Sequence, residues 1–382
     1  MKKTVALDVQ SLFENNKTGI GWTVKQLVDQ LTNCRKFQFQ LNYFGKFQLK
    51  NEKQILENYI DKGCIAKRCP WMELPIYRRI WNFIPIPYNW MFGKNAEITQ
   101  FFNYVIPPGV KGKKVLFIYD MAYKAYPETI SERTKADLNR NLQISSQRAD
   151  IICTISEFSK SEIVKYLNVP EEKIKIVSCG VNRKLFHTQY SDDAVRNVKE
   201  KYNISGSYFL YLGTLEPRKN VLKIIQAYNL FRKRNEKCPK LVIAGKKGWL
   251  YEDIFAYVKS QQIENLVIFT GYVESNEVPV LMRGATTFLF PSLYEGFGLP
   301  VLEAMSCGTP VITSYNTSLR EVAGDAGLLV NPESEEQIAE CMQKINDNAD
   351  LCRRLSEKGL KQSAKFTWEE AAKTLSDLYM KL

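Results

Sequence analysis

The sequence is poor in the residues that most metal and nucleophile sites need. It has one His in 382 residues, and its nine Cys are scattered without a paired spacing. This disfavours a structural zinc site and a disulfide framework, and it indicates reduced thiols in a cytosolic protein. No Asp-x-Asp pair occurs anywhere in the chain. The lone His has no Ser or Cys nucleophile motif beside it, so a hydrolase triad is not indicated.

Long apolar runs are also lacking. No run approaches the length of a membrane span, and the opening MKKTVALDVQ alternates like a strand rather than a secretory signal. Repeats, low-complexity tracts and the patterns of nucleic-acid-binding modules are absent too. We therefore expect a cytoplasmic globular protein with no nucleic acid partner.

Composition and charge fit a two-domain protein with an anionic neighbour. Hydrophobic residues make up 45% and charged residues 25% of the chain, and 382 residues suffice for two cores. The net charge is +12, and residues 1–200 carry 31 Lys+Arg against 20 Asp+Glu. A basic first half suggests an anionic partner: a phospholipid surface, a lipid-linked diphosphate acceptor or nucleic acid. Nucleic acid fits less well, because no nucleic-acid-binding pattern appears. The alternative is a generally basic protein without such a partner.

Short β-rich runs alternate with amphipathic segments along the chain. In the second half they lie at 208–213, 241–245, 266–271, 286–290, 310–314 and 327–331, and in the first half at 4–10, 39–45, 98–102, 115–120, 150–156 and 174–178. This alternation predicts parallel sheets with helices on both faces, which bind ligands at the carboxyl ends of their strands. The polar segment 187–207 predicts a domain boundary near 185–205.

The most informative stretch is FPSLYEGFGLPVLEAMSCGTPVITS at 290–314. It places Glu295 and Glu303 eight positions apart, around a glycine turn between an apolar run and a short helix. Free backbone N–H groups at such a turn bind anions, and two carboxylates beside it can hold hydroxyl groups of a sugar or ribose. The alternative is that Glu303 only offsets the helix dipole and Glu295 is a solvated loop residue.

EGFGLPVLEAMSCGTPVI closely resembles the E-x7-E motif of glycosyltransferase family 4, the retaining nucleotide-sugar transferases. The likeness covers nearly the whole chain: 211–220 (YLGTLEPRKN) looks like the donor-phosphate loop, 153–163 and 173–182 like the end of the first domain, and 365–379 like the terminal helix. It implies an α/β, GT-B fold, with two Rossmann-like domains facing a central cleft and a C-terminal helix crossing back to the first domain. We expect an N-terminal acceptor-binding domain at 1–190 plus 367–382 and a C-terminal nucleotide-sugar-binding domain at 191–366.

The resemblance also assigns site residues. Fixed cations stabilise the charge of a departing diphosphate, and this role falls to Arg218 and Lys219. The expected catalytic residues are Glu295, Asp120, Arg218 and Lys219, although Asp120 could instead cap a turn. Glu303 would bind ribose. The expected donor-binding residues are Gly19, Gly21, Gly213, Arg218, Lys219, Gly271, Tyr272, Val273, Glu295, Gly296, Phe297, Gly298, Leu299 and Glu303.

The resemblance predicts a retaining hexosyltransferase that uses a GDP-, UDP- or dTDP-sugar. Because no Asp-x-Asp pair is present, we expect Arg218 and Lys219 to replace a metal, and we expect no cofactor. Related transferases often read His-Asp where this chain reads Tyr119-Asp120. In many of them that His contacts the donor sugar, so the departure bears on which sugar is transferred more than on the type of reaction. The spacing from Asp120 to Glu128 resembles surface-polysaccharide mannosyl- and rhamnosyltransferases, which favours a mannose-like sugar.

We expect the acceptor to be a glycan, lipid-linked, in lipopolysaccharide or other cell-surface polysaccharide synthesis. The protein would then contact the anionic inner face of the plasma membrane peripherally. Two alternatives are a GT-B enzyme with a soluble small-molecule or glucan acceptor, and a catalytically silent glycan- or lipid-binding relative. The aromatic segment 71–102 fits either an interfacial membrane segment or a buried helix and connector.

Overall fold

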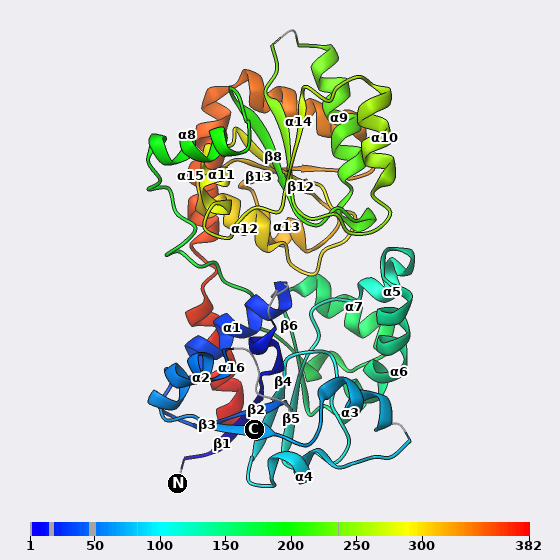
Figure 1. Ribbon diagram of the computed structural model, residues 1–382, viewed down its shortest axis with the longest axis vertical. Coiled ribbons are helices and arrows are strands. Elements are labelled where there is room, and N and C mark those ends of the chain that lie inside the picture. The colour runs from blue at the N-terminus through cyan, green and yellow to red at the C-terminus, as the bar shows by residue number, and fades with distance from the viewer. Residues whose placement is uncertain (1, 15–18, 46–50, 82, 236) are drawn as a thin grey trace. The chain divides into compact units, whose positions relative to one another are not determined.

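The computed structural model describes residues 2–14, 19–45, 51–81, 83–235 and 237–382. The chain forms two compact units. The first comprises Met1–Lys124, Ile130–Cys179 and Trp368–Leu382, and the second comprises Ala125–Thr129 and Gly180–Thr367. Each unit is built on one parallel sheet, and Figure 1 labels their elements.

The first unit has a seven-stranded sheet in the order β3-β2-β1-β4-β5-β6-β7, with every neighbouring pair parallel. The strands are β1 (Thr4–Asp8), β2 (Gln38–Phe44), β3 (Ile65–Cys69), β4 (Ile98–Phe101), β5 (Lys113–Phe117), β6 (Ile151–Thr154) and β7 (Ile174–Ile176). The helices are η1 (Gln10–Phe13), α1 (Gly19–Leu31), α2 (Glu52–Asp61), α3 (Leu74–Ile80), α4 (Tyr88–Phe92), α5 (Ala122–Ala125), α6 (Glu132–Arg148), α7 (Glu157–Leu167), η3 (Glu171–Lys173) and α16 (Trp368–Lys381).

The last helix of the chain, α16, belongs to the first unit. It packs beside α1, where Figure 1 shows it in red. Its side chains Leu375 and Tyr379 are fully buried, and the Tyr379 hydroxyl donates a hydrogen bond to Gln100 Oε1 at 2.9 Å. Gln100 lies on β4, so the end of the chain is held by apolar burial and by a buried hydrogen bond to the sheet. The predicted return of the C-terminal helix is confirmed.

The second unit has a six-stranded parallel sheet in the order β10-β9-β8-β11-β12-β13. The strands are β8 (Tyr208–Leu212), β9 (Lys240–Ala244), β10 (Val267–Gly271), β11 (Thr287–Phe290), β12 (Val311–Ser314) and β13 (Gly327–Val330). The helices are η2 (Pro127–Thr129), α8 (Asp192–Lys201), η4 (Pro217–Lys219), α9 (Val221–Lys233), α10 (Glu252–Ser260), α11 (Val278–Gly284), α12 (Leu299–Ser306), α13 (Ser318–Ala323), α14 (Glu335–Asp347) and α15 (Ala349–Ser363). Strands β11 and β12 are buried at every position, as expected for strands covered on both faces.

The structure departs from the sequence expectations at two elements. Strand β3 was not expected, because its sequence, IAKRC, carries two cations and its first four residues remain exposed or half-buried. The polar segment 187–207 contains helix α8, capped by the Ser191 hydroxyl and without buried residues. A solvated helix of this kind shows no apolar stripe strong enough to distinguish it from a polar linker.

The aromatic segment 71–102 divides between the two alternatives. Its buried members pack among themselves and on the sheet, with Tyr77 and Phe44 stacked at a centroid distance of 5.4 Å. The buried rings are Tyr77, Trp81, Tyr88, Phe92, Phe101 and Phe102, and the exposed ones are Trp71, Phe83 and Trp90. The segment is therefore a core connector that also presents apolar side chains to solvent. None of the described helices has the length and hydropathy to cross a bilayer.

Candidate active site

The site predicted in the second unit lies at the point where the strand order reverses. From β8 the chain proceeds to β9 and β10 on one side, and β11 lies on the other side of β8. In open parallel sheets, ligands bind outside the carboxyl ends of the strands at such a switch point. The loop after β8 carries Arg218 and Lys219, and the loop after β11 carries Glu295. Because these strands are neighbours, the two loops meet.

Four charged side chains form a buried ion-pair cluster there. Lys219 Nζ lies 2.5 Å from Glu295 Oε1, and an Arg218 guanidinium nitrogen lies 3.2 Å from Glu295 Oε2. The other terminal nitrogen of Arg218 lies 2.7 Å from Glu216 Oε1. Glu216 and Glu295 are each 8% exposed. Glu295 is therefore not a solvated loop residue, and it holds both predicted phosphate-binding cations.

Burial and charge act in opposite directions on these groups. Burial by itself would raise the pKa of the Glu295 carboxyl, but the Lys219 and Arg218 cations hold it below its ordinary value. Burial lowers the pKa of Lys219, and the neighbouring Arg218 charge lowers it further, against the opposing effect of Glu295. A buried carboxylate flanked by cations stays ionised. The cluster therefore presents fixed charges in a water-poor setting, where electrostatic stabilisation is strong.

The turn at 295–298 is fixed by its backbone. Gly298 has φ 108°, and a Cβ at this position would collide with the Leu319 side chain of α13. The Ser318 hydroxyl hydrogen-bonds with the carbonyl oxygens of Glu295 and Phe297, at 2.7 and 3.0 Å. Helix α12 starts directly after this turn, at Leu299. The helix start therefore lies beside the charge cluster, as an anion-binding corner requires.

Glu303 lies on α12 and differs from Glu295 in its surroundings. No described residue donates a hydrogen bond to the Glu303 carboxyl. Burial raises the pKa of Glu303 to about 8. The group is a half-buried carboxyl without a countercharge, which natural cores rarely keep without a functional reason. Its predicted contact with ribose hydroxyls remains a prediction.

Asn220 joins three loops at this edge of the sheet. It follows Lys219, adopts a left-handed backbone with φ 62°, and begins helix α9. Its side-chain amide donates hydrogen bonds to the carbonyl of Pro291, at 3.0 Å, and to that of Pro332, at 2.7 Å. These carbonyls follow β11 and β13. The loop that carries the two cations is thereby tied to the loop that carries Glu295.

The remaining donor-binding candidates of this unit lie along the same edge. Gly213 follows β8, and a Cβ on the neighbouring Gly245 would collide with the Gly213 carbonyl, so the two backbones touch. Gly271 ends β10, and Tyr272 and Val273 follow it. Strand β10 is two strands away from β8, a separation of roughly 10 Å at the usual strand spacing. Tyr272 is 52% exposed and Val273 is buried.

The predicted residues of the first unit are placed differently from the expectation. Gly19 and Gly21 do not form a loop; they lie in the first turn of α1, and Gly21 is buried. Asp120 follows β5 by three residues, and its Oδ1 accepts a hydrogen bond from Ala122 N at 3.1 Å, as a turn cap does. The Tyr119 hydroxyl is buried without a hydrogen-bond partner among the described residues. Burial raises its pKa well above the ordinary value.

Glu216 was missed by the sequence analysis. It lies in the LEPRKN segment, two residues before Arg218, but its type and position alone do not distinguish it from a solvated loop residue. The only available signal was the strong local positive charge of Arg218 and Lys219, which a buried site must balance. Across the described residues, no group of three or more His, Cys, Asp or Glu side chains could hold a metal ion.

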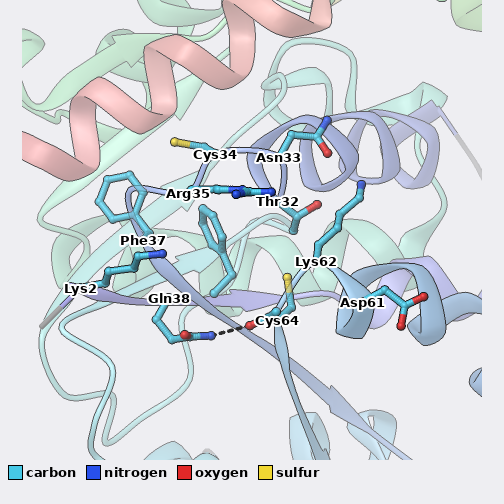
Figure 2. Close-up of a pocket in the computed structure, with 12 residues that line it drawn as sticks. Lys2, Thr32, Asn33, Cys34, Arg35, Phe37, Gln38, Asp61, Lys62 and Cys64 are labelled. Carbon is cyan, nitrogen blue, oxygen red and sulfur yellow. Dashed lines mark hydrogen bonds between the residues drawn. The ribbon is translucent and has the colours of Figure 1, made fainter.

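A cavity of about 520 Å³ in the first unit lies away from the ligand edge of its sheet (Figure 2). Its lining residues, among them Arg35, Gln38 and Lys62, surround the start of β2 and the C-terminal ends of α1 and α2. In Figure 2 the Gln38 side chain donates a hydrogen bond to Gly63 O, at 2.7 Å. Helix C-termini carry partial negative charge, and ligands of parallel sheets bind at the opposite strand ends. This cavity is therefore not assigned to the donor.

Comparison with known proteins identifies the family and the fold of this chain. The family model of glycosyl transferases group 1 matches residues 193–362. O-antigen chain mannosyltransferase B of Escherichia coli is 34% identical over 280 residues, which cover 72% of each chain. O-antigen chain mannosyltransferase RfbU of Salmonella typhimurium is 27% identical over 262 residues, covering 69% of this chain and 68% of that protein. The Anabaena protein Alr3699/HepE, solved in complex with UDP and glucose, superposes with a TM-score of 0.72 over all of both chains, at 14% identity.

The two parallel-sheet units have the GT-B architecture, and the family match and the curated relatives show a glycosyltransferase. The chain belongs to the group 1 glycosyl transferases.

Proposed function

We propose that this protein is a family 4 mannosyltransferase that acts with retention and without a metal. It transfers mannose from GDP-mannose to a hydroxyl of a lipid-linked glycan in cell-surface polysaccharide synthesis. The observation that carries this proposal is the buried cluster of Arg218, Lys219 and Glu295 at the switch point. The mannose assignment is supported by the Escherichia coli and Salmonella typhimurium relatives, both of which are O-antigen chain mannosyltransferases.

In this proposal Arg218 and Lys219 bind the donor diphosphate. As the bond between the sugar C1 and the phosphate oxygen breaks, negative charge grows on the leaving phosphate, and the two cations stabilise it more than they stabilise the ground state. The acceptor hydroxyl attacks C1 from the face that the phosphate leaves, and its proton passes to the departing phosphate. The configuration at C1 is thereby retained. The backbone amides at the start of α12 add hydrogen bonds to the diphosphate.

Glu295 has two tasks in this scheme. It holds Arg218 and Lys219 in position in the free protein, and with 296–299 it contacts the transferred sugar. Glu303 accepts hydrogen bonds from ribose hydroxyls, and 271–273 line the base pocket. Asp120 and the glycines of α1 belong to the first unit, where the acceptor binds. The protein acts on the cytoplasmic side and touches the inner face of the membrane.

The test is a transfer assay with GDP-mannose, UDP-glucose and dTDP-rhamnose, each in excess EDTA, with a synthetic prenyl-diphosphate-linked glycan as acceptor. We expect turnover with GDP-mannose, and a product whose mannosidic linkage is α by NMR. A β linkage would refute retention. Loss of turnover in EDTA, restored by Mn²⁺, would refute metal independence. A different accepted donor would replace the mannose assignment.

The variant Glu295→Gln tests the role of the cluster. We expect it to bind GDP but to lose at least ~10-fold in kcat, because the sugar contact and the positioning of both cations depend on the carboxylate. Glu335→Gln is the matched control, since Glu335 pairs with Lys223 at 2.8 Å in the same unit but lies outside the cluster. Unchanged turnover in Glu295→Gln would reject the assignment.

A further inference from the structure

A second cavity of the first unit is lined by four arginines. It has a volume of about 600 Å³. Arg78 and Arg79 come from the last turn of α3, and Arg133 and Arg140 come from α6. Figure 1 shows these two helices in the first unit. We call this the arginine cavity.

The arginine cavity opens at the ligand edge of its sheet. Its lining includes Ile20, which lies between the two glycines at the start of α1, and Asn103 and Tyr104, which follow β4. Strands β1 and β4 are neighbours in the centre of the sheet, where its strand order reverses. The cavity therefore occupies in this unit the position that the ion-pair cluster occupies in the other, at the carboxyl ends of the strands around a switch point.

The positive charge of the arginine cavity exceeds the negative charge beside it. Within the described part of the chain, none of the four guanidinium groups has a recorded ion pair or hydrogen bond. The Arg78 Nε atom is buried without a partner. Asp137 is the one carboxylate of the lining, and its Oδ1 already accepts a hydrogen bond from Asn141 at 2.8 Å. The Asp8 carboxylate also acts electrostatically on Arg78.

This contrasts with the second unit, where Arg218 and Lys219 are paired with buried carboxylates. Like charges gathered in a concave surface raise its potential and attract an anion. A planar guanidinium group can bind two phosphate oxygens at once. Four guanidinium groups around one cavity therefore match a ligand with several phosphate oxygens. The volume also falls in the range of ligand sites, about 300–1,000 Å³.

Apolar side chains adjoin the four arginines. Leu74 and Leu138 line the same cavity. Ile76 on α3 is 51% exposed, and Phe83 and Ile84, which lie three and four positions beyond the last residue of α3, are 81% and 62% exposed. Helix α3 and the residues shortly after it thus place cations at the cavity and apolar groups in solvent. This arrangement matches a ligand that has a phosphate head and a hydrocarbon tail.

We propose that the arginine cavity binds the diphosphate of a lipid-linked acceptor, with the hydrocarbon chain lying over Ile76, Phe83 and Ile84. That this lipid diphosphate serves as the acceptor rests on the proposed function. That the cavity binds a lipid diphosphate rests on the cavity alone. Arg78 and Arg79 hold the diphosphate from α3, and Arg133 and Arg140 hold it from α6. The glycan that follows the diphosphate then lies at the carboxyl edge of the sheet.

The test uses farnesyl diphosphate as a soluble probe, with the full chain and calorimetric detection. Arg79→Gln and Arg133→Gln are the variants, singly and combined, because both side chains are exposed and their loss leaves the core intact. We expect each to weaken farnesyl diphosphate binding about tenfold, the loss of one charge-assisted contact, and the pair about a hundredfold. Arg35→Gln, which removes an exposed cation at the opposite strand ends of the same unit, leaves the affinity unchanged.

Three further measurements separate the possible ligands. Farnesol, which lacks the diphosphate, binds at least tenfold more weakly than farnesyl diphosphate if the proposal holds. Equal binding of the two, or variants with unchanged affinity, would overturn it. Variants that lose binding only to phosphatidylglycerol vesicles would assign the cavity to phospholipid headgroups instead. GDP binding tests only the donor site of the second unit. A failure of mannosyl transfer therefore rejects the proposed function, whereas the affinity for farnesyl diphosphate tests the arginine cavity independently.

Discussion

At the scale of single residues, two glutamates eight positions apart have opposite electrostatic settings. Glu295 accepts contacts from Arg218 and Lys219, and these cations keep its pKa below the ordinary value. Glu303 has no such partner among the described residues, and burial raises its pKa to about 8. One motif therefore contains a carboxylate that is ionised near neutrality, Glu295, and a second one, Glu303, whose burial favours the protonated form.

The Glu303 setting predicts a pH dependence of stability. Its carboxyl binds a proton more tightly in the folded protein than in the unfolded chain, so its contribution is fully present below about pH 4.5 and is lost as pH rises towards 8. We expect Glu303→Gln to be more stable than the parent by an amount that grows by about 1 kcal/mol per pH unit between pH 5 and 8. Urea unfolding at each pH measures this difference. Glu340→Gln, at an exposed position of α14, controls for the lost charge. A gap that stays constant with pH would show that the site does not desolvate Glu303.

At the scale of elements, the site depends on loops that connect neighbouring strands. The loops after β8, β11 and β13 meet through the Asn220 amide, which donates to two carbonyls while its own backbone is left-handed. Helix α12 begins directly after Gly298, where the positive φ and the Leu319 side chain would strain any residue with a Cβ. The strands set the positions of these loops, and the hydrogen bonds between the loops set the distances within the charge cluster.

Asn220→Ala tests this coupling. We expect it to lower the free energy of unfolding by about 2–4 kcal/mol, because two part-buried carbonyls lose their donor and Ala tolerates the left-handed backbone poorly. The Michaelis constant for the donor should also rise, since the cation loop is no longer tied to the Glu295 loop. Urea unfolding and transfer kinetics measure the two effects.

Asn168→Ala is the control for backbone conformation. Asn168 ends α7 with a left-handed backbone at φ 50°, and no side-chain hydrogen bond is recorded for it. Asn168→Ala should therefore lower the free energy of unfolding only by the cost of a left-handed Ala, about 1 kcal/mol, and leave the transfer kinetics unchanged. Equal costs at both positions would mean that the two Asn220 hydrogen bonds contribute nothing.

At the scale of the whole molecule, the chain starts and ends in the same unit. Residues 368–382 return after the second unit is complete, and Tyr379 contributes its ring and hydroxyl to the core beneath β4. Sequence order and structural units therefore differ: the first unit cannot complete its core until the last helix has docked.

Tyr379→Ala should destabilise the first unit selectively. Loss of a fully buried aromatic ring costs about 3–5 kcal/mol. Hydrogen exchange is the suitable readout, because two-unit proteins need not unfold in one step. We expect faster exchange in β1, β4 and β5 and unchanged exchange in β8, β11 and β12, with GDP affinity preserved. Tyr379→Phe, which removes only the hydrogen bond to Gln100, should destabilise the first unit by about 1 kcal/mol. Equal acceleration in both units would contradict a core confined to the first.

The local pattern of the sequence predicted parallel sheets covered by helices, and the family resemblance supplied the GT-B arrangement and the returning C-terminal helix. The twelve β-rich runs correspond to strands in both units, because strands covered by helices on both faces read as short, nearly continuous apolar runs. Strand β3 was not predicted, because it is an edge strand with two cations and little burial. The resemblance of 290–314 and 211–220 to family motifs pointed to Glu295, Arg218 and Lys219, although their mutual contacts were not predicted.

Sequence alone determined the alternating elements, the glycine turn and the charged residues beside it, since these depend on near neighbours along the chain. Only the tertiary structure decided which of them meet. Lys219 and Glu295 are separated by 76 positions and touch because β8 and β11 pair. Glu216 joins them, and Arg78, Arg79, Arg133 and Arg140 gather around one cavity, because α3 and α6 flank the same sheet edge. The physical reason is that strand order and helix packing are set by long-range burial, which no local spacing encodes.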